Sequence, residues 1–243
     1  MPTVNVKNIE MLNIKTVFLD IDDTLWWFSE NSKMALRHVF NLYALNQHID
    51  YEMFRNIYTV KNRELWRKYQ LGLVEKDTLV SDRFRYALQL SGYGGDCVKM
   101  ATLLNTTYLD YLGSLPLLVP GARELLEYLQ SRGYELNTLS NGFLGVQEQK
   151  LRSGGIAHFF THNILSEQCG IAKPQRGIFD YALERSGACP ETTVMIGDNP
   201  EADIEGAHHA GWHTIYFNIK NRDIAGDLAD PTVYYLDEIR EIL

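Results

Sequence analysis

The chain has 243 residues, of which 45% are hydrophobic and 22% charged, the balance of a folded protein with room for one domain and a smaller second one. Its formal net charge of −8 argues against a basic surface for nucleic acid. No run approaches the roughly 20 apolar residues that cross a bilayer, and the three scattered cysteines form neither a disulfide framework nor a zinc site. We therefore expect a cytoplasmic protein with no nucleic-acid or membrane partner, as a monomer or small homo-oligomer.

The first predicted element is a short buried strand, because Lys15 to Leu19 is an apolar, β-branched run that stops at Asp20. The following segment, up to about residue 112, shows helical spacing and no convincing strand. It predicts four helices, near 29–46, 50–70, 77–91 and 96–113, with Asp50, Asp77 and Asp96 as N-caps and Gly72, Gly92 and Gly113 as stops.

The remainder of the chain alternates between strand and helix patterns, which is typical of a doubly wound α/β fold with a parallel sheet. We expect an α/β core formed by residues 1–25 and 115–243, and an all-helical cap at 26–114 inserted after the first strand. In such sheets, ligands bind at the carboxyl ends of the strands. The later strands are predicted at 134–139, 159–165, 193–196 and 213–217, and the helices between them at 121–130, 143–152 and 174–186.

The first chemical motif is the pentapeptide Asp20-Ile21-Asp22-Asp23-Thr24 at the end of the first strand. Residues two apart in an extended chain point to the same side, so Asp20 and Asp22 can face one site while Ile21 packs away. Two neighbouring carboxylates repel unless a cation or a shared proton intervenes, which suits Mg²⁺. They also suit a nucleophile beside a proton-transfer group, although an acidic turn at a strand end has the same pattern.

Two more motifs follow later strands or loops. Ser140-Asn141-Gly142 ends one strand and offers a hydroxyl and backbone N–H groups that could cradle a phosphate, although it also fits a polar turn. Lys173 stands before a proline at a helix start and could neutralise phosphate and carboxylate oxygens, although such a lysine is usually only solvated.

The last motif places Asp198 after an apolar strand and Asp203 five residues further on, within the next helix. Asp198 could complete a metal site, and Asp203 could orient Asp198, Lys173 or a water, although an aspartate cap would look the same. Four such signals at the ends of separate strands are far more specific together than any one alone, because a doubly wound sheet brings them to one edge.

These four motifs, in this order, resemble those of the haloacid dehalogenase-type hydrolase superfamily, in the branch with a helical cap. The resemblance implies that Asp20 is the nucleophile that becomes an aspartyl-phosphate and that Asp22 is the general acid and then the base. It implies that Asp20, the backbone carbonyl of Asp22, and Asp198 hold Mg²⁺, and that Lys173 stabilises the charge. It also implies phosphoryl binding by Thr24, Ser140, Asn141 and Gly142, with Asp203 as a supporting residue.

A finer resemblance points to bacterial nucleotidases that act on noncanonical pyrimidine nucleoside monophosphates. It rests on Leu65 to Gly72, on Phe143 with Gln147 and Leu151, and on Ala172 to Leu183. The resemblance implies a small phosphorylated substrate, a nucleotide. The aromatic run Trp26 to Phe28 could stack on a base or could pack the hinge between core and cap.

Other activities stay open at this point. A sugar-phosphate phosphatase or a phosphomutase fits the same motifs. A 2-haloacid dehalogenase needs neither metal nor an acid two residues after the nucleophile, so Asp22 and Asp198 argue against it. A phospho-receiver domain is much shorter and lacks the insert, and a binding module without catalysis is disfavoured because no motif residue is missing.

Overall fold

The computed structural model describes residues 13–221 and 231–243, and the chain divides into two compact units. An α/β unit combines Met1–Phe28 with Pro116–Leu243, and a helical unit comprises Ser29–Leu115. Among the described residues, no helix is both long enough and apolar enough to cross a membrane.

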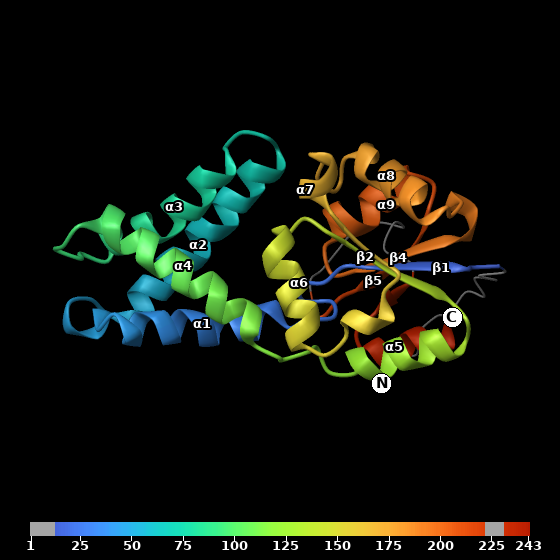
Figure 1. Cartoon of the computed structure of the whole chain (residues 1–243), viewed down its shortest axis with the longest axis horizontal. Coiled ribbons are helices and arrows are strands. Elements are labelled where there is room, and N and C mark those ends of the chain that lie inside the picture. Colours follow the sequence, from blue (N-terminus) through green and yellow to red (C-terminus); the bar gives the residue numbers. More distant parts are fainter. Residues whose placement is uncertain (1–12, 222–230) are drawn as a thin grey trace. The chain divides into compact units, whose positions relative to one another are not determined.

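The α/β unit is built on a six-stranded sheet in the order β3-β2-β1-β4-β5-β6, and every neighbouring pair is parallel. This order confirms the predicted doubly wound fold, since the chain crosses from β1 outward on one side and then returns to the other side. Helices flank the sheet on both faces (Figure 1). The strands are β1 (Thr16–Leu19), β2 (Glu135–Ser140), β3 (His162–Leu165), β4 (Thr193–Gly197), β5 (His213–Phe217) and β6 (Thr232–Val233).

The helices of this unit follow the predicted alternation, with shifts of one or two residues at their ends. They are α5 (Ala122–Ser131), α6 (Leu144–Ser153), α7 (Ser166–Cys169), α8 (Arg176–Ser186) and α9 (Gly206–His209). The unit also contains the 3₁₀ helices η2 (Ala157–Phe159), η3 (Pro190–Thr192) and η6 (Leu236–Glu241) and the π-helix η4 (Pro200–Glu205).

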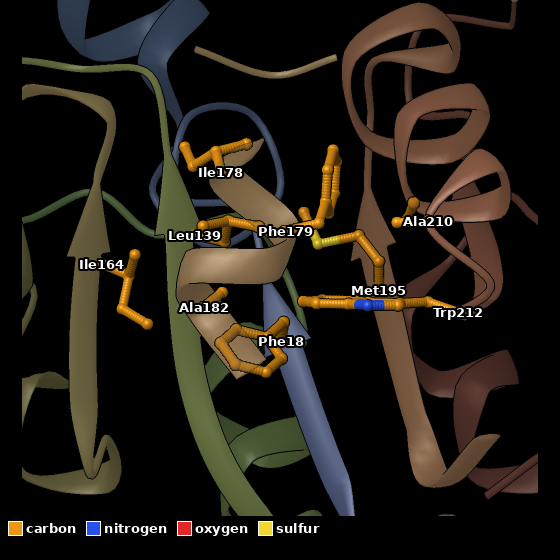
Figure 2. Packing of buried hydrophobic residues seen from close by; sticks show 10 residues of the cluster. Phe18, Leu139, Ile164, Ile178, Phe179, Ala182, Met195, Ala210 and Trp212 are labelled. Carbon is orange, nitrogen blue, oxygen red and sulfur yellow. The ribbon is translucent and has the colours of Figure 1, made fainter. Parts of the chain in front are cut away.

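A buried apolar cluster joins α8 and the turn before β5 to the sheet (Figure 2). Phe18 of β1 lies 4.8 Å from Trp212, and Phe179 of α8 meets the same indole edge-on at 5.3 Å between ring centroids. Full burial of side chains of this size contributes about 2 kcal/mol each. This packing fixes the start of α8, which the chain reaches directly after Lys173.

The helical unit contains α1 (Phe28–Leu42), η1 (Leu45–Gln47), α2 (Tyr51–Gln70), α3 (Lys76–Leu90) and α4 (Cys97–Ser114). Its interior is aromatic. Tyr58 and Phe84 lie 4.7 Å apart, and Tyr108 packs edge-on against both, at 5.8 Å and 5.4 Å between ring centroids. The role of this unit as a cap stays a prediction.

The helix ends confirm some of the expected signals and correct others. Asp50 accepts a hydrogen bond from the Met53 N–H, and Asp96 caps α4 in the same manner, as predicted. Asp77 is not an N-cap, because α3 already begins at Lys76 and Asp77 lies in its first turn, where it favours the helix dipole.

Gly113 does not stop α4. The helix continues to Ser114 and ends at Leu115, whose extended backbone is the conformation preferred before a proline such as Pro116.

Candidate active site

The central position of β1 brings three of the four motifs together. Leu19 pairs with Thr138 of β2 on one side and with Ile196 of β4 on the other. Asp20 follows directly after Leu19, and Ser140 and Asp198 stand two residues beyond the paired positions. All three residues therefore lie at the carboxyl edge of adjacent strands, where the doubly wound fold places its ligands.

Lys173, the remaining motif, reaches the same edge. Its Nζ donates to Asp20 Oδ1 at 2.8 Å, to Asp203 Oδ1 at 2.6 Å and to the Leu139 carbonyl at 2.5 Å. The lysine side chain is 2% exposed. Burial alone would lower the pKa of Lys173, but the attraction of Asp20 and Asp203 and their hydrogen bonds outweigh it and raise the pKa. The lysine is a fixed positive charge against the predicted nucleophile.

Asn141 positions Lys173 rather than turning its side chain to a ligand. Its Nδ2 donates to the Lys173 carbonyl at 2.9 Å, and its Oδ1 accepts from the Lys173 N–H at 2.8 Å. This reciprocal pair holds the loop before α8 against the end of β2. Because the Asn141 side chain is used in this way, only its main chain is available for the predicted phosphate binding.

Three buried carboxylates, those of Asp20, Asp198 and Asp203, have oxygens within 4.8 Å of one another. Burial raises the pKa of Asp20 to about 8, opposed by Lys173 and reinforced by the neighbouring carboxylates. Burial likewise raises the pKa of Asp198 to about 6, opposed by Lys220. Such crowding favours a bound cation. The carboxylate of Asp22 is not in this group, and the metal ligand predicted at this residue is its backbone carbonyl.

Asp22 instead points to α6. Lys150 Nζ lies 2.6 Å from Asp22 Oδ1, and Gln147 Nε2 donates to Asp22 Oδ2 at 3.0 Å. The same Gln147 nitrogen donates to the Ser140 hydroxyl at 2.7 Å. Sequence reasoning gave Lys150 no role, although its spacing of three residues from Gln147 puts both on one face of a helix.

A second lysine was also missed. Lys220, in the segment after β5, bridges Asp198 Oδ2 at 2.6 Å and Asp23 Oδ2 at 2.8 Å. No signal in the sequence connects it to the site, because it stands 22 residues from Asp198 in a polar stretch.

The Ser140 turn is arranged around its hydroxyl. Ser140 Oγ accepts from Gln147 Nε2 and, at 3.2 Å, from the Gly142 N–H. A Cβ at Gly142 would collide with the Gln147 amide, so a larger residue there would displace this side chain. Thr24 Oγ1 is buried and has no hydrogen-bond partner among the described residues, so it could still bond a ligand oxygen.

The charges of the site do not balance. Five carboxyl groups meet three ammonium groups in three separate sets of ion pairs, which is an excess of two acidic groups. Mg²⁺ prefers oxygen ligands, and its two positive charges would compensate for the two acids in excess. The residues present therefore fit the predicted metal. The set comprises Asp20, Asp22, Asp23, Asp198 and Asp203 with Lys150, Lys173 and Lys220.

Comparison with known proteins identifies the class. The chain matches the haloacid dehalogenase-like hydrolase family over residues 14–211. It is 31% identical to pyrimidine 5'-nucleotidase YjjG of Escherichia coli, over 93% of this chain and 96% of that protein. It is 30% identical to a glyceraldehyde 3-phosphate phosphatase of Methanothermobacter thermautotrophicus, over 94% of this chain and 98% of that protein.

Among solved structures, the putative HAD-hydrolase YfnB of Bacillus subtilis bound to magnesium superposes with a TM-score of 0.83 at 31% identity, covering 95% of this chain and 98% of that one. The chain belongs to the haloacid dehalogenase-like hydrolase family and is a hydrolase whose relatives include named nucleotidases and phosphatases.

Proposed function

We propose that this chain is a Mg²⁺-dependent phosphomonoester hydrolase that works through a phosphorylated Asp20, with a pyrimidine nucleoside monophosphate as substrate. The observation that carries the proposal is the buried contact of the Asp20 carboxylate with Lys173 at the carboxyl edge of the sheet. A carboxylate held in this way keeps its orientation while phosphoryl charge develops beside it.

In the first step, an Asp20 oxygen attacks phosphorus and the ester oxygen leaves with a proton from Asp22. In the second, Asp22 takes a proton from the water that attacks the aspartyl-phosphate, which releases phosphate and restores Asp20. Lys173 offsets the charge on the nucleophile throughout. The Ser140 hydroxyl already accepts two hydrogen bonds, which directs its own proton toward a phosphoryl oxygen.

The carboxylates of Asp20 and Asp198 and the backbone carbonyl of Asp22 would hold Mg²⁺. Its chemistry there is charge neutralisation at the phosphoryl oxygens. Asp203 holds two parts of the site in place, since it pairs with Lys173 and accepts a hydrogen bond from the Asn199 N–H at 3.0 Å. Gly197 permits this, because a Cβ there would overlap the Asp203 carboxylate.

The substrate assignment rests on the relatives. YjjG and the 30% identical PynA of Streptococcus pneumoniae are both named pyrimidine 5'-nucleotidases. The glyceraldehyde 3-phosphate phosphatase relatives make a sugar phosphate or triose phosphate the second candidate. We infer that the helical unit Ser29–Leu115 serves as the cap that supplies contacts to the leaving group.

Phosphate release across a panel of phosphomonoesters tests the proposal, with and without Mg²⁺ and with Asp20→Asn as the blank. We expect metal-dependent release that disappears in the blank and is fastest for pyrimidine monophosphates. Faster release from triose phosphates would retain the mechanism and refute the nucleotidase assignment. Metal-independent release, or full activity in the blank, would refute the mechanism.

A further inference from the structure

Lys150 is buried at the active site although the four motifs do not include it. Its side chain is 4% exposed, and its Nζ lies 2.6 Å from Asp22 Oδ1. The ammonium group also lies 4.8 Å from the ring centroid of Trp26 and 5.3 Å from that of Phe28. A lysine is rarely buried this completely unless a charge and other favourable contacts compensate for its lost hydration.

Among residues 13–221 and 231–243, few groups hold the Asp22 side chain in place. The side chain is 30% exposed, and each of its oxygens accepts one hydrogen bond, Oδ1 from Lys150 and Oδ2 from Gln147. A half-exposed aspartate without such contacts samples several rotamers. With one donor on each oxygen, the plane of the carboxyl group is fixed as well as its position.

Helix α6 is built to present these two donors. Gln147 and Lys150 stand three residues apart and are both buried on one face, whereas Arg152 on the same helix is 74% exposed. Glu167 accepts the Leu144 N–H at 2.6 Å and so fixes the start of the helix. The donors are therefore anchored before any substrate arrives.

We propose that Lys150 is a positioning residue that aims the Asp22 carboxyl group at the oxygen of the departing alcohol. The inference rests on the proposed function, because it assumes that Asp22 supplies a proton to the leaving group. Gln147 completes the arrangement by connecting Asp22 to Ser140, so the proton donor and the phosphoryl-binding hydroxyl are held by the same helix.

This role predicts a dependence on the leaving group. A nucleoside leaves as a basic alkoxide unless it receives a proton, whereas p-nitrophenolate is stable enough to leave unaided. General acid catalysis contributes about 100-fold or more where the proton is needed. If the Asp22 carboxyl group loses its orientation, cleavage of the nucleotide should therefore slow, whereas cleavage of the activated aryl ester should not.

The experiment compares Lys150→Met with the parent on uridine monophosphate and on p-nitrophenyl phosphate, both with Mg²⁺. The readout is release of the leaving group in the first turnover, because the later attack of water uses Asp22 for every substrate. We expect a loss of about 100-fold for the nucleotide and less than about threefold for the aryl ester. Arg152→Met is the matched control on the same helix and should change neither rate.

Two further variants separate positioning from folding. Lys150→Arg retains the charge and should recover part of the nucleotide rate, and adding Lys150→Met to Asp22→Asn should cause no additional loss. Equal losses for both substrates, or no loss for the nucleotide, would overturn the inference while leaving the phosphatase intact. A parent enzyme that cleaves neither substrate would instead refute the proposed function.

Discussion

Asp20→Asn should make the metal-free protein more stable near neutral pH, although it removes the proposed nucleophile. Burial raises the pKa of Asp20 from 3.8 to about 8, so the folded state binds this proton more tightly than the unfolded chain does. Between these two values, a rise in pH ionises the unfolded chain first and destabilises the folded state. Asparagine has the same shape and no charge, so it escapes this penalty.

The size of the effect follows from the two pKa values. At about pH 7 the pH lies roughly three units above the unfolded pKa of 3.8, so the cost of burying this carboxyl group is about 4 kcal/mol. The variant also loses the contact of Asp20 with Lys173, but Lys173 keeps Asp203 at 2.6 Å, so this loss costs only about 2 kcal/mol. We expect a net gain of about 2 kcal/mol at about pH 7, which for a protein of this size raises Tm by roughly 4–8 °C.

Thermal unfolding with a metal chelator present, at a series of pH values from about 5 to 8, measures this difference. The gain should disappear near pH 5, where the carboxyl group costs only about 2 kcal/mol. Addition of Mg²⁺ should stabilise the parent more than the variant, because the cation offsets the charge of Asp20. A variant that is less stable than the parent at about pH 7, or a difference that does not change with pH, would refute the reasoning.

Three other substitutions test separate parts of the structure. Gly142→Ala places a Cβ against the Gln147 amide and should lower the free energy of unfolding by about 1–3 kcal/mol, measured by urea denaturation, together with a lower kcat. Lys220→Met removes the ammonium group that competes for Asp198 and should tighten Mg²⁺ binding by about tenfold in a calorimetric titration, whereas weaker binding would show that Lys220 orients its partner. Asp50→Ala removes the cap of α2 and should cost about 1 kcal/mol in urea denaturation without changing the kcat of the enzyme, and an unchanged midpoint would contradict this cap.

The fold was largely predictable because its signals are local. Strands β1, β4 and β5 are largely apolar runs that end at a polar or glycine position, and the alternation with helices allows few topologies. The predicted strand at 193–196 appears as Thr193–Gly197, and the predicted strand at 213–217 is reproduced. Errors fall at helix ends such as Asp77 and Gly113, where neighbouring residues of similar propensity compete for the cap. The strand predicted at 159–165 is also shorter than expected, because it begins at His162 after the short helix Ala157–Phe159.

The meeting of the motifs was predictable for the same reason, whereas the partner of each side chain was not. Phosphate binding by Asn141 stays a prediction, and the sequence did not reveal that the Asn141 side chain holds the Lys173 backbone. Phosphate binding and the contact with the Lys173 backbone both require an asparagine or similar residue at this strand end. Only the path of the loop before α8, which the core around Phe179 and Trp212 determines, distinguishes them.

The three lysines show where sequence reasoning ends and why the site needs more than its motifs. Lys173 could be found because it stands before a proline at a predicted helix start, but Lys150 is 128 residues from Asp22 along the chain. A sheet edge that gathers five carboxylates needs cations from wherever the chain returns to it, and these positions depend on tertiary structure. Even so, the three ammonium groups leave an excess of two acidic groups. Because this internal pairing is incomplete, the folded site still favours a divalent cation. A fourth lysine in this set would leave an excess of only one acid and weaken the attraction for the metal that the proposed chemistry uses.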